Sequence, residues 1–431
     1  MESVVSKLVS QVSIPKMFKV RQLFPCESIS EKDIPKMIRE KLSRPDLIEQ
    51  IKPGMSIAIT AGSRGIAHVA LITKTIVDFV KDRQAYPFVV AAMGSHGGAS
   101  SEGQREILEN FGITEETMGC PIKTSMEVIK IGTNEEGMDV KISRDAFEAD
   151  GIIISCRIKP HTCFRGPYES GIMKMMTIGL GKQAGAEVCH AAGFKYMAKY
   201  VPMFGKAILK NANILFALAV LENAYDETAK IIALNHDEIE EEEPKYLIEA
   251  KNLLPKIYVE QCDVLVCDTI GKNFSGSGMD ANITGTFVTP YATGGLKSQR
   301  VAVLDLSKES HNNGCGIGMA NATTKRFFEK MDFEQTYPNV ITSTVIENVR
   351  VPMVMKNDKE AIQVCIRTCT DIDKQNIRIV RIANSMEIEH IYLSEAYYKE
   401  ARCNPNLVIE TEPSPMQFDE NGNLVDLGHI K

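Results

Sequence analysis

Lys174 and His190 are sixteen residues apart, and the glycine-spaced segment GIMKMMTIGLGKQAG contains the lysine and precedes the histidine. His161 lies shortly before this segment, and the glycine-rich stretch MGSHGGAS at 93–100 carries His96. Lysine amines form covalent links to cofactors, and neutral imidazole is the commonest metal ligand in proteins. The four side chains therefore predict a cofactor or metal site, provided that the fold brings them together.

Three predicted strands each lead into a loop that carries one of the candidate residues. The strands cover 55–60, 86–93 and 151–156. The loops after them carry Arg64, His96 and His161, in that order. The apolar pattern predicts helices over 66–81 and 101–110, with Ser100 or Ser101 as the N-cap of the second. Strands alternating with helices favour a parallel sheet, whose right-handed crossovers place all three loops at its carboxyl edge.

The rest of the chain predicts further α/β structure. We expect strands at 214–220, 229–234, 262–268 and 301–305, and a helix at 246–254 that Pro255 ends. The acidic run DEIEEEEP at 237–244 is typical of a solvated loop or helix start. We therefore predict an α/β fold of two domains, 1–258 and 259–431, with mostly parallel sheets flanked by helices. The active site is expected in the cleft between the domains, and the last residues are expected to wrap over the surface or pack back on the N-terminal domain.

Composition narrows the class of protein. The chain has 431 residues and a net charge of −7, which argues against a nucleic-acid partner because phosphate binding needs concentrated positive charge. No apolar run is long enough for a membrane span, and the N-terminus lacks the apolar core of a signal peptide. Eleven cysteines without a CxxC spacing indicate free thiols in a reducing cytoplasm and argue against a zinc ribbon or an ordinary iron–sulfur site.

Each candidate side chain also has a structural alternative. His96 could be a surface imidazole in a tight turn, His161 a hydrogen-bonded loop residue, and His190 a core histidine. Lys174 stands among three methionines, so its amine is either buried and nucleophilic or extended toward solvent. The glycines at 179, 181 and 185 do not have dinucleotide-fingerprint spacing, and neither a Walker lysine motif nor a GxSxG elbow occurs.

With these residues in place, the chain resembles the nickel-pincer-dependent lactate racemase family. The resemblance depends on an arginine after a strand (Ser63-Arg64), a G-x-H loop (Gly94-Ser95-His96) and the spacing from Lys174 to His190. It covers roughly residues 50–200 well and the C-terminal half loosely.

The resemblance implies a role for each matching residue. Lys174 would carry a nickel-bearing pyridinium-3,5-bisthiocarboxylic acid mononucleotide through a thioamide, and His190 would be the protein ligand to nickel. His96 and His161 would be the acid/base pair on opposite faces of the substrate. Arg64 would grip a carboxylate or help to hold the cofactor, and Ser63 and Gly94 would line the cofactor site.

Departures from the family indicate a divergent branch. Ala61 stands where the family usually has an aspartate, the gap from His161 to Lys174 is longer, and the C-terminal substrate motif is replaced. The C-terminal loops contain GKNFSGSGMDANITG and SHNNGCGIGMANATTKR. The candidate substrate contacts are Arg64, Arg165, Lys272, Asp280, His311 and Asn312. For the last four, the alternative is that they are turn residues in glycine-rich loops.

The resulting hypothesis is an isomerase, a nickel-dependent racemase or epimerase of a 2-hydroxy acid or sugar acid. Removing the α-hydrogen as hydride while a histidine takes the hydroxyl proton gives a planar keto acid, and return of hydride to the other face inverts the centre. The alternatives are a dehydratase or dehydrogenase that uses the same cofactor, and a non-catalytic protein that binds a small carboxylate. The expected partner is a small molecule, with no nucleic acid and no membrane. The substrate, cofactor loading and oligomeric state, a homo-oligomer included, stay open.

Overall fold

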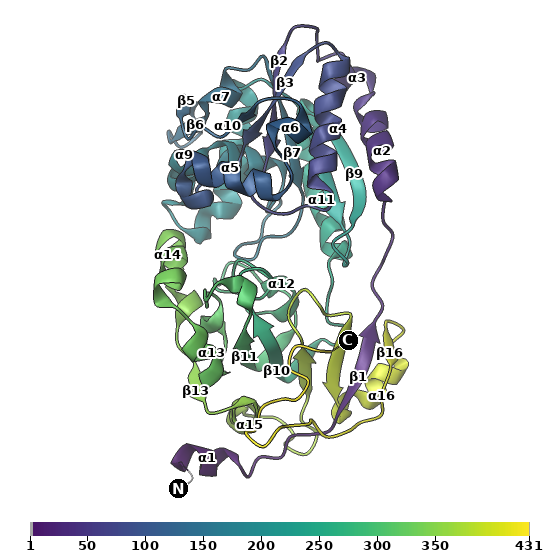
Figure 1. Cartoon of the computed structure of the whole chain (residues 1–431), viewed down its shortest axis with the longest axis vertical. Helices are drawn as coiled ribbons and strands as arrows, with labels where there is room; N and C mark the ends of the chain where they lie inside the picture. Colours follow the sequence, from purple (N-terminus) through teal and green to yellow (C-terminus); the bar gives the residue numbers. More distant parts are fainter. Residues whose placement is uncertain (1–2, 431) are drawn as a thin grey trace. The chain divides into compact units, whose positions relative to one another are not determined.

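The computed structural model describes residues 3–430 and divides the chain into two compact units. One unit runs from Pro25 to Leu254. The other unit combines the chain up to Phe24 with the chain from Pro255 onward. We had expected a first domain of 1–258. The difference is at the N-terminus, because strand β1 (Met17–Gln22) pairs with strands from the end of the chain. In Figure 1 this purple strand lies among yellow ones.

The unit from Pro25 to Leu254 is built on a six-stranded sheet of order β4-β3-β2-β7-β8-β9. Its strands are β2 (Ser56–Ala61), β3 (Tyr86–Ala91), β4 (Ile122–Lys123), β7 (Gly151–Arg157), β8 (Ile214–Glu222) and β9 (Thr228–Asn235). All neighbouring strands are parallel except β8 and β9. A separate two-stranded sheet pairs β5 (Val128–Thr133) with β6 (Asp139–Ser143). The strands expected at 55–60, 86–93, 151–156, 214–220 and 229–234 are confirmed.

Helices cover both faces of this sheet (Figure 1). They are α2 (Ile34–Leu42), α3 (Pro45–Ile48), α4 (Val69–Asp82), α5 (Ser101–Asn110), α6 (Glu115–Met118), α7 (Arg144–Phe147), α8 (Ile172–Lys174), α9 (Lys182–His190), α10 (Met197–Asn211) and α11 (Ile239–Leu253). Alternate strand residues enter two different apolar clusters: Ile57 and Ile59 pack in one, and Ala58 packs in the other. Because both faces are covered, the strands are apolar throughout. Ser100 caps α5, as expected.

The other unit contains an eight-stranded sheet of order β13-β12-β11-β10-β14-β15-β1-β16. Its further strands are β10 (Gln261–Ile270), β11 (Lys297–Leu306), β12 (Ala322–Thr324), β13 (Met353–Met355), β14 (Ile379–Ile382), β15 (His390–Ser394) and β16 (Leu407–Ile409). The five strands from β13 to β14 are parallel, and the remaining three are antiparallel. Its helices are α1 (Val4–Val9), α12 (Ala281–Thr284), α13 (Lys325–Lys330), α14 (Phe333–Ser343), α15 (Asp358–Thr368) and α16 (Tyr398–Cys403). The α/β fold with mostly parallel sheets flanked by helices is thus confirmed.

The C-terminal tail packs on the unit that contains strands β10 to β16; that it packs back on the N-terminal domain stays a prediction. Buried polar groups hold it there. The carboxylate of Asp268 accepts from the Gly428 N–H at 2.9 Å, and Arg381 contacts the carboxylate of Asp426 at 3.0 Å. Asp268 also pairs with Arg381 at 2.8 Å, and both side chains are buried. A buried pair of this kind needs extra hydrogen bonds to offset desolvation, and the tail supplies them.

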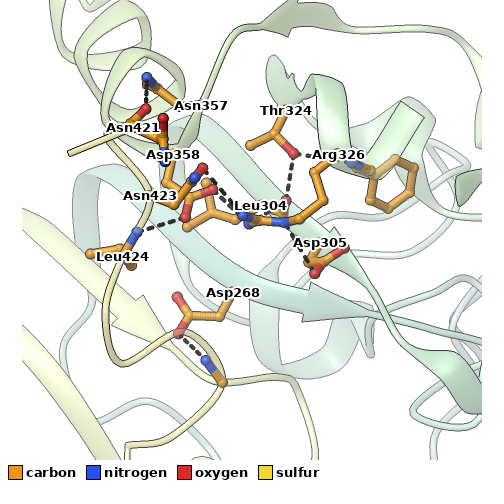
Figure 2. Close-up of polar contacts among 12 residues, drawn as sticks. Asp268, Leu304, Asp305, Thr324, Arg326, Asn357, Asp358, Asn421, Asn423 and Leu424 are labelled. Carbon is orange, nitrogen blue, oxygen red and sulfur yellow. Dashed lines mark hydrogen bonds and ion pairs between the residues drawn. The ribbon is translucent and has the colours of Figure 1, made fainter. Parts of the chain in front are cut away.

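A second, partly buried group of charges lies around Arg326 (Figure 2). Its guanidinium donates to the carboxylate of Asp358 at 2.7 Å and to the Leu304 carbonyl at 3.2 Å. Asp358 also accepts from the backbone N–H of Leu424 at 2.8 Å, and Asn423 contacts Arg326 at 3.3 Å. The Asp358 side chain is fully buried, so this carboxylate connects α13 and the tail.

Asp358→Asn should therefore lower the free energy of unfolding by about 2 kcal/mol, because an amide weakens a charge-assisted bond and turns one acceptor into a donor. Urea denaturation measures the change. Glu329→Gln is the matched control, because Glu329 pairs with Lys325 on the same helix but both side chains are exposed; it should change stability by less than about 0.5 kcal/mol. Equal losses in the two variants would contradict the assignment.

Among residues 3–430, no helix combines the length and the apolar character that crossing a lipid bilayer requires.

Candidate functional site

The loops after β2 and β3 meet at the carboxyl edge of the six-stranded sheet. Ser63, in the first loop, hydrogen-bonds through its hydroxyl to Nδ1 of His96, in the second. The His96 side chain is exposed. Gly94 has a φ of +58°, and a Cβ there would lie 3.2 Å from the Ile178 side chain, so a larger residue would be strained and crowded. The loops of Arg64 and His96 were expected to meet, and the contact between Ser63 and His96 shows that they do.

A buried polar pair anchors the loop of His96. The side-chain amide of Gln104 donates to the carbonyls of Gly94 at 3.0 Å and His96 at 3.3 Å. Lys182, at the start of α9, donates to Gln104 Oε1 at 3.1 Å and to the Ala91 carbonyl at 2.6 Å. Burial lowers the pKa of Lys182 to about 8. Neither anchor was expected, because nothing in the local sequence pattern separates them from ordinary surface residues.

The loop after β7 carries His161 and is organised around Glu169, whose side chain is fully buried. Its carboxylate accepts from the His161 backbone N–H at 2.7 Å, from Lys251 at 2.6 Å and from Arg165 at 3.2 Å. Arg165 also donates to the His161 carbonyl at 2.5 Å. Arg165, expected as a substrate contact, thus holds the loop in shape. Glu169 was not expected: two of its partners lie within eight residues, but Lys251 is 82 residues away in the sequence.

The ring of His161 is half-buried and packs near two aromatic rings. Its Nδ1 accepts the backbone N–H of Cys163 at 3.0 Å. Ring centroids of Phe164 and Phe194 lie 4.6 and 6.2 Å away. Burial, followed by the positive charge of Lys174, lowers the pKa of His161 well below its ordinary value. The imidazole is therefore neutral at neutral pH.

Lys174 ends the short helix α8 and is followed by a π-helical turn over Met175–Leu180. Burial lowers the pKa of its amine to about 8, and the charges of Arg64 and Lys159 act in the same direction. π-helical turns are rare in proteins, and those that do occur often lie at functional sites. At neutral pH the unprotonated fraction of Lys174 is therefore far larger than that of an ordinary lysine. This gives the expected nucleophilic amine a physical basis.

A buried carboxyl group positions the helix of Lys174. Glu243, on α11, is 1% exposed and accepts the backbone N–H of Met173 at 3.0 Å. A Cβ at Gly171 would lie 2.2 Å from the Glu243 carboxylate, so glycine allows this close approach. Burial raises the pKa of Glu243 to about 8. The acidic run does begin a helix, but the expectation that it is entirely solvated is wrong at Glu243.

His190 is the last residue of α9. Burial, with a smaller effect from Lys174, lowers the pKa of His190 to about 4. Its ring lies 5.7 Å from Phe194, the side chain that also contacts His161. Phe194 therefore connects the two imidazoles, and the electrostatic effect of Lys174 on both rings places all three groups in one region of this unit.

Arg64 follows β2 and has an exposed side chain. Surrounding protein nevertheless desolvates its guanidinium enough to lower the pKa of Arg64, and its charge reaches Lys174. A cation that is both accessible and close to Lys174 can bind an anionic ligand there.

The remaining substrate candidates follow β10 and β11 in the other unit. Lys272 donates to the Gly276 carbonyl at 2.7 Å, and Asp280 caps α12 through the Asn282 N–H at 2.8 Å. His311 and Asn312 are exposed residues with φ of +49° and +61°. These contacts are those of turns and a helix cap, the alternative given for them above. Their role toward a substrate, and the active site in a cleft between domains, stay predictions.

Within residues 3–430, no three histidine, cysteine or acidic side chains come together closely enough to hold a metal ion by themselves. The N-terminal candidates instead offer single donors of different kinds. His190 provides a neutral imidazole and Lys174 an amine that deprotonates readily.

Comparisons with known proteins give one family and several solved structures, two of which are named below. Residues 7–199 match the family model described as lactate racemase N-terminal domain. The lactate racemase apoprotein from Thermoanaerobacterium thermosaccharolyticum is 15% identical, with 67% of this chain and 74% of that chain covered and a TM-score of 0.46. A protein from Thermotoga maritima is 14% identical, with 94% and 98% covered and a TM-score of 0.49. No curated protein matches the sequence.

Proposed function

We propose, from the premise that residues 7–199 belong to the lactate racemase N-terminal domain family, that the protein is a racemase or epimerase of a 2-hydroxy acid or sugar acid. The observation that carries the proposal is the Lys174 amine, whose pKa burial lowers to about 8. It lies near two imidazoles, His161 and His190, whose pKa values burial lowers as well. A buried amine beside neutral imidazoles fits a covalently held, metal-bearing cofactor.

The donor set fits a nickel-pincer mononucleotide. Lys174 would form the covalent link through its unprotonated amine, and the neutral His190 ring would donate one nitrogen to the metal. Because the pincer brings its own sulfur and carbon donors, one protein ligand completes the site. Ser63 and Gly94, in the adjoining loops, would line the cofactor site. When bound, this group would supply a reversible acceptor of the α-hydride.

The chain's own residues would bind the substrate and manage its proton. Arg64 would attract the substrate carboxylate, because its guanidinium is accessible and already desolvated. His96 would take the hydroxyl proton. Its side chain is exposed, and the hydrogen bond between its Nδ1 and Ser63 restrains the orientation of the ring. His161 would face the reacting oxygen from the neighbouring loop.

A panel of enantiopure 2-hydroxy acids and sugar acids, incubated in deuterium oxide and followed by chiral chromatography, tests this function. The protein should be isolated from a host that makes the cofactor and should contain about one nickel per chain. Inversion that retains the substrate α-hydrogen is expected, because hydride return does not exchange with solvent. Accumulation of a keto acid or an unsaturated acid would instead favour a dehydrogenase or dehydratase. No change in any substrate with loaded protein would favour a carboxylate-binding protein without activity.

A further inference from the structure

The π-helical turn that follows Lys174 contacts the loop of His96. The backbone N–H of Gly94 donates to the Gly179 carbonyl at 3.2 Å. A Cβ at Gly179 would lie 2.8 Å from the Ala92 carbonyl oxygen, so a side chain there would push the two segments apart. This single backbone hydrogen bond fixes one point of the loop and leaves its orientation to other contacts.

Lys182 supplies a second, buried connection to the same loop. Its side chain and that of Gln104 are both fully buried. The ammonium group donates to the Ala91 carbonyl, where β3 ends, at 2.6 Å and to Gln104 Oε1 at 3.1 Å. Gln104 in turn donates from Nε2 to the carbonyls of Gly94 at 3.0 Å and His96 at 3.3 Å. One chain of hydrogen bonds therefore runs from the start of α9 to the backbone of His96.

Two features of Lys182 are unfavourable for folding. Burial lowers the pKa of Lys182 to about 8, so the amine still carries its charge at neutral pH, and the two oxygens that accept from it are neutral. Burying such a charge is costly. The residue also has a φ of +54°, a left-handed conformation that is uncommon for a residue with a side chain. Strain of this kind is concentrated at functional sites, which indicates a role for Lys182 beyond packing.

We propose that Lys182 is a positioning residue that, through Gln104, holds the loop of His96 in place against the segment that would carry the cofactor. The part of His96 in proton transfer rests on the proposed function. A base acts only within hydrogen-bond reach of the proton that it takes, and a displacement of about 1 Å can cost about 100-fold in rate. Because His190 belongs to the same helix as Lys182, a loop tied to Lys182 keeps its position relative to the candidate metal ligand.

The position of His96 can be measured without cofactor or activity. In the unloaded protein with ¹³C,¹⁵N-labelled histidine, the ring signals of His96, assigned through His96→Gln, should shift and broaden in Lys182→Met. Gln104→Glu should have the same effect, because its carboxylate accepts from Lys182 but has no N–H for the loop carbonyls. It decides the question alone if Lys182→Met does not fold. His390, in the other unit, is the reference signal. Unchanged His96 signals in a folded variant overturn the proposal.

Turnover of the loaded enzyme distinguishes positioning from general support of the fold. Lys182→Met and Gln104→Glu should each retain the adduct on Lys174 and the nickel, and should lower kcat by about 100-fold with KM within about threefold of wild type. The two losses should not multiply in the double variant, because either change breaks the same chain of hydrogen bonds. Gln183→Met is the matched control: this exposed neighbour on α9 contacts only Glu187 among the hydrogen bonds given for its side chain, and kcat should stay at the wild-type value.

The possible results separate a failure of this role from a failure of the proposed function. Losses that multiply in the double variant, or a fall in nickel content as large as the fall in turnover, would contradict positioning by Lys182. If loaded wild type turns over no substrate, the proposed function fails, and the His96 signals of the unloaded protein still decide whether Lys182 positions the loop.

Discussion

Replacing Lys174 by arginine should give a folded protein that carries no covalent cofactor and inverts no substrate. Arginine keeps a positive charge of similar length but has no nucleophilic amine at accessible pH. In protein from a cofactor-making host, intact-mass spectrometry should show the adduct on wild type and its complete absence from Lys174→Arg. On the proposed function nickel content should fall with it, because His190 would offer a single ligand and, among residues 3–430, no three acidic, cysteine or histidine side chains are grouped to hold a metal ion.

The pH dependence of the amine gives a second measure of the same residue. Since burial lowers the pKa of Lys174 to about 8, its reactive fraction rises from pH 6 and levels off above about pH 9. An ordinary lysine titrates near 10.4, so at pH 8 the unprotonated fraction of Lys174 should be about 100-fold larger. Peptide mapping after brief treatment of the unloaded protein with a small amine-reactive reagent measures the ratio.

Lys159→Arg is the matched control. Lys159 is a cation near enough to lower the pKa of Lys174, and arginine keeps that charge. This variant should retain the adduct and the nickel. An unmodified Lys174 in active wild-type protein, or an adduct that persists in Lys174→Arg, would refute the covalent role of Lys174.

The sequence predicted the parts of the fold that depend on short-range patterns. Continuous apolar runs identified β2, β3 and β7, and the βα order predicted their parallel pairing. The same logic predicted that the loop of Arg64 meets the loop of His96, and the contact between Ser63 and His96 shows that these two loops do meet. Residues in the loops after adjacent strands meet at one edge whatever the intervening helices contain.

Long-range partners could not be predicted in this way. Glu243 lies in a run of glutamates, and only the tertiary fold selects it for burial beneath the helix of Lys174. Strand β1 is a similar case, since its apolar alternation is compatible with pairing in either unit. A single sequence carries no signal for which partner a buried group or an edge strand will choose.

The second large effect is expected at Glu169, whose buried carboxylate accepts from His161, Lys251 and Arg165. Glu169→Leu removes every one of these acceptors and leaves two cations without this partner, which should cost about 3–5 kcal/mol in the free energy of unfolding. Glu169→Gln retains one carbonyl oxygen and should cost about 2 kcal/mol. Urea denaturation gives both values.

A control variant, together with nickel content and turnover, distinguishes a displaced His161 loop from a general loss of stability. Glu187→Gln changes an exposed glutamate on α9 that contacts Gln183, and should alter stability by less than about 0.5 kcal/mol. At a temperature where Glu169→Gln stays folded, its nickel content should equal that of wild type, because Lys174 and His190 lie outside the Glu169 loop. Turnover should still fall, since the backbone N–H that fixes His161 loses charge-assisted support. A fall in nickel content as large as the fall in turnover would place Glu169 in cofactor binding instead.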